Sequence, residues 1–272
     1  MTISQALKAA AARLAHTSDT PRLDAELLMA HALDVPREML LVSHLGDPAP
    51  TAFEPLVLRR LLHEPVAYIT GRRGFWTIEL EVTHGVLIPR PDTETLLDAA
   101  VAHFGNAGPK TILDLGTGSG ALLLAALDQW PGAHGLGLDT SDRAIDLARR
   151  NAERLGLASR AKIDARWWAM GVRARFDLIL CNPPYVEASC ELPQTVRDWE
   201  PHSALFAGAD GLDCYRHLAP QISERLAPGG IACVEIGATQ AASAGALFEA
   251  RGLAVALRKD LAGHDRCLIL SR

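Results

Sequence analysis

The second half of the chain alternates between short apolar runs and amphipathic segments, and this alternation constrains the fold more than any other feature. After residue 110, most runs typical of a buried strand are followed by a segment with the spacing of a helix. Parallel strands need long, usually helical crossovers, so the alternation predicts a mostly parallel, doubly wound α/β sheet. Strands are expected at 111–115, 136–139, 161–165, 176–181, 231–236, 253–257 and 267–270, and helices at 121–130, 141–155, 212–226 and 239–251.

The first 70 residues differ from the rest because their apolar residues show only helical spacing. Apolar residues between Ile3 and Leu14 recur at three- and four-residue steps. Pro21 suits the first position of a second helix, and two more short helices follow. We therefore expect a small all-helical domain at 1–72 and a larger domain at 73–272.

A β-hairpin is expected to connect these domains, within residues 73–90. Apolar and polar residues alternate from Gly74 to Val82, as in a half-buried strand. A turn is expected at 83–85, and the apolar run at 86–88 is expected to be the return strand.

The composition limits the classes of protein to consider. A net charge of −5 and a pI near 6.1 argue against a protein that binds nucleic-acid backbones through clustered Lys and Arg. The five cysteines include no C-x-x-C pair, which favours free thiols over a zinc site or a disulfide framework. No apolar run reaches the roughly 18 residues needed to span a membrane, and the first residues lack a signal-peptide core. We therefore expect a cytoplasmic protein with no metal and no membrane or direct nucleic-acid partner.

The segment Asn182-Pro183-Pro184-Tyr185 directly follows the apolar run at 176–181. Two consecutive prolines donate no N–H and restrict φ, so the strand must end there and the chain leaves it stiffly. Asn182 is thereby placed at the carboxyl end of a strand, where open α/β sheets bind their ligands. An amide and an aromatic ring on a rigid loop suit a flat polar group, whereas the alternative is a surface turn without a ligand.

A glycine-rich loop, D-L-G-T-G-S-G at 114–120, joins the strand at 111–115 to the next helix. Glycines allow a tight turn and let a ligand approach the backbone closely. Asp139 ends the following strand, where a carboxylate can accept hydrogen bonds from both hydroxyls of a ribose. The glycine spacing also matches the dinucleotide fingerprint, so a nicotinamide-dependent oxidoreductase is a rival. Asp114, which suits a cationic ligand, and the lack of a hydride-transfer constellation favour another cofactor.

The glycine loop, Asp139 and the segment 182–185 together resemble class I S-adenosylmethionine-dependent methyltransferases that modify planar nitrogens. Further motifs narrow the resemblance to the PrmC/HemK family, which methylates the side-chain nitrogen of the glutamine in the Gly-Gly-Gln motif of class I peptide chain release factors. The motifs run in order from about residue 60 to residue 268, whereas the first 70 residues resemble that family's N-terminal domain only in length and texture. They are E-P-x-A-Y-I-x-G at 64–71, I-P-R-P-D-T-E at 88–94, E-P-x-x-A-L at 200–205, D-G-L at 210–212, E-I-G at 235–237 and D-L-A-G-x-D-R at 260–266.

The resemblance implies a Rossmann-like methyltransferase fold with S-adenosylmethionine as cofactor. The glycine loop would wrap the methionine part, Asp139 would hold the ribose and Trp167 would lie by the adenine. Arg166 stands where the family usually has an acid, so contacts on the adenine side are expected to differ. The cofactor contacts implied are Gly116, Thr117, Gly118, Ser119, Gly120, Asp139, Trp167 and Asn182.

The resemblance also implies that residues 182–185 hold the substrate glutamine of a release factor. A carboxamide nitrogen is a poor nucleophile because its lone pair is delocalised into the carbonyl. The side-chain oxygen of Asn182 and the backbone carbonyl of Pro183 can accept hydrogen bonds from its two N–H groups and aim the remaining lone pair at the methyl group. Tyr185 would pack on the flat amide, and Pro184 would complete the contact. No general base is assigned, since the proton becomes acidic only after transfer.

Other functions stay open beside this one. A glutamine methyltransferase of a ribosomal protein would carry nearly the same motifs. An adenine-N6 nucleic-acid methyltransferase would use the same loop on a flipped base, but the negative net charge disfavours it. A non-catalytic binding module is disfavoured because Asn182, Tyr185 and Asp139 are all present. The helical domain at 1–72 precedes a complete catalytic domain, and we expect it to recognise the protein substrate.

Overall fold

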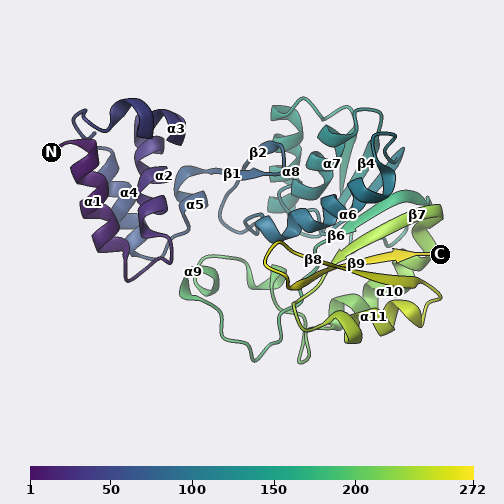
Figure 1. The fold of residues 1–272 in the computed structure, drawn as a ribbon. Helices are drawn as coiled ribbons and strands as arrows, with labels where there is room; N and C mark the ends of the chain where they lie inside the picture. The colour runs from purple at the N-terminus through teal and green to yellow at the C-terminus, as the bar shows by residue number, and fades with distance from the viewer. The chain divides into compact units, whose positions relative to one another are not determined.

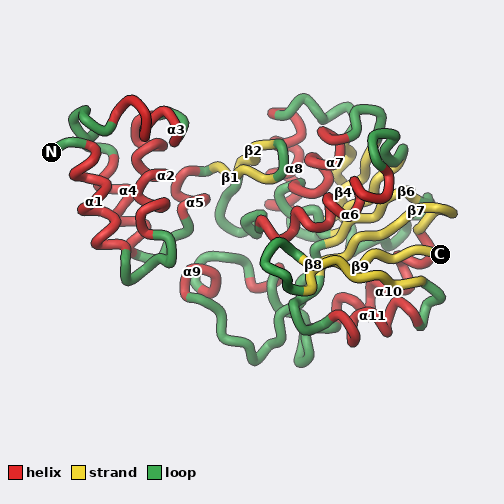
Figure 2. The backbone as a smooth tube through the Cα atoms, viewed as in Figure 1, coloured by secondary structure: helices red, strands yellow, loops and turns green.

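The helices and strands of the computed structural model, which describes residues 1–272, fall into two units (Figure 1, Figure 2). The first unit contains Met1–Arg72 together with the later segment Leu192–Trp199. The second contains Arg73–Glu191 and Glu200–Arg272. None of the helices combines the length and the apolar composition that crossing a membrane requires.

The first unit is all-helical, and its elements are α1 (Ile3–Leu14), α2 (Pro21–Leu33), α3 (Arg37–Met39), η1 (Leu40–His44), α4 (Phe53–Leu61), α5 (Val66–Thr70) and α9 (Gln194–Arg197). A capping box starts α1, because the Thr2 hydroxyl accepts a hydrogen bond from the Gln5 N–H and the Gln5 side chain accepts one from the Thr2 N–H. Pro21 begins α2, as its ring predicts. The apolar faces of α1, α2 and α4 share one buried core that includes Leu7, Leu28 and Val57.

A two-stranded hairpin, β1 (Arg72–Phe75) and β2 (Ile78–Glu81), begins the second unit. The sequence predicts a single strand at 74–82, but the chain already turns at Trp76, which has a φ of 54°, and this segment forms both strands of the hairpin. The expected return strand at 86–88 was wrong, since these residues form no strand. The N–H of Ile88 donates to Glu200 Oε2 at 3.1 Å, a side chain 112 residues away that the local pattern does not reveal.

The predicted doubly wound sheet is confirmed, and its seven strands lie in the order β5-β4-β3-β6-β7-β9-β8. The first five of these pair in parallel, whereas β9 runs antiparallel to both β7 and β8. Predicted and observed bounds agree for β3, β5 and β6. The strands are β3 (Thr111–Leu115), β4 (His134–Asp139), β5 (Ala161–Ala165), β6 (Phe176–Cys181), β7 (Leu226–Glu235), β8 (Ala254–Lys259) and β9 (Asp265–Ser271).

Helices cover both faces of the sheet (Figure 1). They are η2 (Pro91–Thr93), α6 (Glu94–Phe104), α7 (Ala121–Gln129), α8 (Asp142–Arg154), η3 (His202–Ala204), α10 (Asp213–Arg225) and α11 (Ala241–Glu249). Side chains of α6, α7 and α8 pack with Ile112 and Leu178 on one face. Those of α10 and α11 pack with Leu113 and Ile179 on the other, because successive strand residues point to opposite faces.

A buried amide ties the hairpin to the site. Asn151 of α8 is 0% exposed. Its Oδ1 accepts from the Glu81 N–H at 2.8 Å, and its Nδ2 donates to the Glu81 carbonyl at 3.0 Å. The same Nδ2 donates to the Ser119 carbonyl at 2.9 Å. The side chain therefore joins β2, α8 and the glycine loop, and it satisfies all three backbone groups.

Candidate active site

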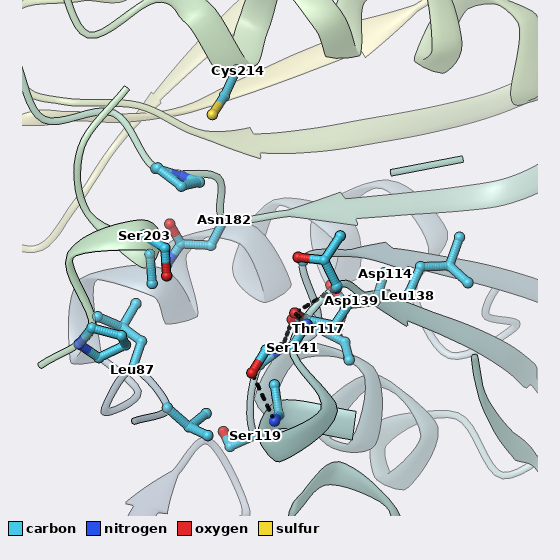
Figure 3. A pocket seen from close by; sticks show the side chains of 18 of the residues that line it. Leu87, Asp114, Thr117, Ser119, Leu138, Asp139, Ser141, Asn182, Ser203 and Cys214 are labelled. Atoms are coloured by element: carbon cyan, nitrogen blue, oxygen red, sulfur yellow. Dashed lines mark hydrogen bonds between the residues drawn. The ribbon is translucent and has the colours of Figure 1, made fainter. Parts of the chain in front are cut away.

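A cavity of about 450 Å³ opens at the carboxyl ends of the parallel strands (Figure 3). Residues that follow β3, β4, β5 and β6 line it. The strand order reverses between β3 and β6, and open α/β sheets bind ligands at such a switch point. Figure 3 shows Thr117 and Asp139 on one side of this cavity and Asn182 and Ser203 on the other.

The glycine loop after β3 is held against the neighbouring strand. The N–H groups of Gly116 and Thr117 both donate to the Leu138 carbonyl at 2.9 Å. Gly116 has a φ of 74°, and a Cβ there would lie 3.4 Å from the Trp168 ring and 3.8 Å from the backbone oxygen of Asn182. The loop thus passes close to the start of the Asn-Pro-Pro-Tyr segment, and any side chain at Gly116 would narrow the space between them.

Asp139, at the end of β4, organises the same wall of the cavity. Its Oδ2 accepts from the Gly118 N–H at 2.9 Å. Its Oδ1 accepts from the N–H groups of Thr140 and Ser141 at 2.8 and 2.9 Å. Each carboxylate oxygen has two lone pairs, so Oδ1 is fully used and Oδ2 can accept one further hydrogen bond, from a ligand hydroxyl. Asp139 lines the cavity, which its predicted role at a ribose requires.

Asp114 brings a buried carboxyl group to the floor of the cavity. Its Oδ2 accepts from the Thr117 hydroxyl at 2.6 Å, whereas its Oδ1 is buried and has no hydrogen-bond partner. Burial raises the pKa of Asp114 to about 7, and the nearby Asp139 charge acts in the same direction. An unpartnered carboxylate in a cavity is a strong acceptor for a cationic group, because pairing would compensate its lost hydration.

Asn182 extends from the end of β6 and is half-buried in the cavity wall. Its Nδ2 donates to the Thr93 hydroxyl oxygen at 3.1 Å. Thr93 ends η2 and is 4% exposed. Because the amide nitrogen is engaged as a donor, the side-chain oxygen of Asn182 stays available as an acceptor for a ligand.

Tyr185 lies behind the cavity wall rather than in it. Its hydroxyl donates to Glu235 Oε1 at 3.2 Å, and its carbonyl accepts from Gln240 Nε2 at 3.0 Å. Burial, and then the Glu235 charge, raise the pKa of the Tyr185 hydroxyl well above its ordinary value. Pro183 is also buried, so the expected contacts of these two residues with a substrate stay predictions.

Most of the predicted site residues nonetheless come together. Gly120 does not line the cavity but forms the N-cap of α7, where its φ is 86° and a Cβ would lie 2.9 Å from Leu124. Pro183 and Tyr185 are likewise absent from the lining. The predicted residues that line the cavity are Gly116, Thr117, Gly118, Ser119, Asp139, Trp167, Asn182 and Pro184.

The predicted adenine side has its own arrangement. Trp167 is 45% exposed, and its ring meets His217 edge-to-face with centroids 4.9 Å apart. The Arg166 N–H donates to the Asp139 carbonyl at 2.8 Å, and its guanidinium donates to the Met170 carbonyl at 3.2 Å. Arg166 is thus folded onto its own loop while it lines the cavity.

Sequence reasoning missed several residues of the wall. Thr93, Ser203, Cys214 and His217 line the cavity, as do residues of the loop before η2. Thr93 and Ser203 lie inside the motifs at 88–94 and 200–205. No neighbouring residue indicates that Thr93 forms a hydrogen bond with Asn182, which is 89 residues away. The structure contains no group of three or more His, Cys, Asp or Glu side chains that could hold a metal.

The fold is that of class I S-adenosylmethionine-dependent methyltransferases. Two protein-family models match the sequence. The PrmC N-terminal domain family matches residues 5–71, and the methyltransferase small domain family matches residues 92–198. A T. thermophilus 16S rRNA N2 G1207 methyltransferase, solved with AdoMet and guanosine, superposes with a TM-score of 0.53 at 22% identity. The match covers 74% of this chain and 49% of that one, and it supports the fold alone.

Two relatives identify the family more narrowly. The release factor glutamine methyltransferase of Rhodospirillum rubrum is 44% identical over 93% of this chain and 80% of its own length. That of Cereibacter sphaeroides is 43% identical over 98% of this chain and 97% of its own length. The chain belongs to the release factor glutamine methyltransferase family, so the resemblance to PrmC/HemK proteins is confirmed.

Proposed function

We propose that the protein transfers a methyl group from S-adenosylmethionine to the side-chain amide nitrogen of the glutamine in the Gly-Gly-Gln motif of class I peptide chain release factors. The names of relatives that share 44% and 43% identity with this chain support the substrate. The observation that carries the chemistry is the single cavity in which the glycine loop and Asp139 lie across from Asn182. A substrate in translation implies that the protein works in the cytoplasm.

The residues around the cavity fit the cofactor. Asp114 Oδ1 lacks a partner and suits the cofactor's ammonium group. Asp139 suits the ribose hydroxyls, and the bare backbone at Gly116 lets the methionine part approach. Trp167 offers a partly exposed ring to the adenine. When bound, the cofactor supplies a methyl group activated by a sulfonium.

The Asn-Pro-Pro-Tyr segment would act on the acceptor amide. We assign the Asn182 side-chain oxygen and the Pro183 carbonyl as acceptors for its two N–H groups, which makes the nitrogen more electron-rich and orients its lone pair. The bond from Asn182 Nδ2 to Thr93 supports this assignment because it directs the amide oxygen away from Thr93. Holding both reactants at attack distance can contribute roughly 7–11 kcal/mol to a barrier reduction.

We assign protein recognition to the helical domain at 1–72 and methyl transfer to the domain at 73–272. The connector at 73–90 contains the hairpin of β1 and β2. The match of residues 5–71 to a separate family model supports treating the first segment as a module. A small peptide can reach a cavity by itself, whereas a folded substrate needs a further surface that fixes its orientation.

The test is incubation with labelled S-adenosylmethionine and a class I release factor, followed by mass spectrometry of the labelled peptide. We expect label on the glutamine of Gly-Gly-Gln and none on a matched release factor in which that glutamine is replaced by alanine. Parallel reactions with ribosomal proteins and with adenine-containing DNA and RNA test the alternatives. Label on one of those and not on the release factor would overturn the proposal.

A further inference from the structure

Glu235 is a buried carboxylic acid just behind the candidate site. It ends β7, the strand next to β6, and is 1% exposed. Its Oε1 accepts the hydroxyl of Tyr185, the last residue of the Asn-Pro-Pro-Tyr segment, at 3.2 Å. Glu235 does not line the cavity, so it can reach a substrate only through other residues.

Thr93 links the same carboxyl group to the first residue of that segment. Its hydroxyl oxygen accepts from Asn182 Nδ2 at 3.1 Å. Thr93 also lies close enough to Glu235 to lower the pKa of that carboxyl group, although the two side chains form no hydrogen bond in the structure. An amide nitrogen can only donate, so the hydrogen of the Thr93 hydroxyl is left for the carboxylate. Oε2 of Glu235 is buried and has no hydrogen-bond partner, so it can accept that hydrogen.

We propose that Glu235 is a positioning residue that orients both ends of the Asn-Pro-Pro-Tyr segment, Tyr185 directly and Asn182 through Thr93. The proposal rests on the proposed function, in which the Asn182 oxygen accepts a hydrogen bond from the substrate amide. Thr93 fixes which way the Asn182 amide faces, because a threonine hydroxyl polarised by a carboxylate is a better acceptor for Nδ2. The Asn182 oxygen is then the atom presented to the methyl acceptor.

The environment of Glu235 argues against a role in stability alone. Arg266 is the cation that acts on it, but the hydrogen bonds of that guanidinium go to Asp260 and to the Ile236 carbonyl, and its ion pairs go to Asp260 and Asp92. A buried carboxyl group without a close cation is costly, and an apolar side chain of similar volume is often as stable or more so. Glu235 contacts Tyr185 and lies near Thr93, which contacts Asn182. Orienting these residues is therefore a role that accounts for the buried carboxyl group.

Four variants separate orientation from folding. Thr93→Val keeps the shape and removes the link, whereas Thr93→Ser restores a hydroxyl. Glu235→Gln keeps the size but replaces one acceptor oxygen by a donor, so it cannot accept from both Thr93 and Tyr185. Thr111→Val is the matched control, because it removes another hydroxyl that donates to a carboxylate, Asp177, at the amino end of β3.

The measurements are kcat and KM for methyl transfer to a Gly-Gly-Gln release factor, calorimetric Kd for S-adenosylmethionine, and Tm. We expect kcat to fall between roughly tenfold and a hundredfold in Thr93→Val and Glu235→Gln, the range for a displaced reacting group. Cofactor Kd should change less than about twofold, and Thr93→Ser should recover most of kcat. The double variant should lose no more than the worse single variant, as expected for residues in one chain of contacts. Thr111→Val should lower Tm without lowering kcat.

Two results would overturn the inference. One is wild-type kcat in Thr93→Val and Glu235→Gln. The other is a loss of kcat that Thr93→Ser does not recover and that Thr111→Val shows to the same extent at an equal fall in Tm. The wild-type protein distinguishes this failure from failure of the proposed function. If wild type does not methylate the release factor, the proposed function fails first, whereas an active wild type with active variants refutes only the role of Glu235.

Discussion

Replacing Asp114 with asparagine should stabilise the folded chain at neutral pH and weaken its affinity for the cofactor. Asp114 is fully buried, and burial raises its pKa from 3.8 to about 7. The folded state therefore keeps a proton that the unfolded state loses, so the free energy of unfolding falls as the pH rises from about 4 to about 7. Asparagine has the same shape and can accept the Thr117 hydroxyl, but it carries no charge, so the variant should lack this dependence.

The magnitude follows from the width of that pH window. From pH 5 to a pKa of about 7 is two pH units, and each unit corresponds to about 1.4 kcal/mol. Between pH 5 and pH 8 the wild-type protein should therefore lose about 3 kcal/mol more unfolding free energy than Asp114→Asn. Burial also raises the pKa of Glu235 to about 7, but that residue is present in both proteins and its contribution cancels.

Urea denaturation of both proteins at pH 5, 6, 7 and 8 measures the stability difference, and calorimetry with S-adenosylmethionine measures the affinity. The wild-type affinity should rise between pH 5.5 and pH 7, as Asp114 loses its proton and can pair with the ammonium group, whereas the variant should show a flatter profile. Parallel stability profiles for the two proteins would refute the argument that Asp114 titrates in this range. Equal cofactor affinity at pH 7 would refute its role at the ammonium group.

Three further perturbations test the other assignments. Asn182→Ala should abolish methyl transfer while calorimetry finds cofactor affinity largely unchanged, and an equal loss of both would contradict the role of the amide oxygen. Asp139→Ala should weaken cofactor binding by at least about tenfold, since hydrogen bonds to a charged group contribute roughly 1.5–3 kcal/mol each; an unchanged Kd would exclude a ribose contact. Deleting residues 1–70 should raise KM for an intact release factor more than KM for a short Gly-Gly-Gln peptide, and an equal rise would argue against recognition by the helical domain.

Short-range sequence patterns predicted the strands whose bounds are set by neighbouring residues. Strands β3, β5 and β6 were bounded correctly. The prolines after Cys181 end β6 in the structure as in the prediction, because they can neither donate to a ladder nor adopt its dihedrals freely. The run at 86–88 misled because it has the composition of a strand, yet Ile88 bonds to a side chain far along the chain.

The residues of the candidate site also separate into those that local sequence patterns predict and those that depend on long-range packing. The glycine loop, Asp139 and Asn182 were predictable because each follows an apolar run, and parallel strands bring their carboxyl ends to one edge. Thr93 was not predictable, since its contact with Asn182 depends on how η2 packs at that edge. Tyr185 was expected in the cavity, but an aromatic residue after two prolines does not reveal that its hydroxyl bonds to Glu235 on the neighbouring strand.

The Asn151 side chain pairs with Glu81 through both its oxygen and its nitrogen, much as a neighbouring strand would. It thereby satisfies the backbone groups of the last residue of β2 and, through the Ser119 carbonyl, fixes the glycine loop that lines the cavity. A substitution at this solvent-inaccessible helix position would consequently act like a mutation in the cavity wall. Variants there belong among the loss-of-function changes, although they touch neither reactant.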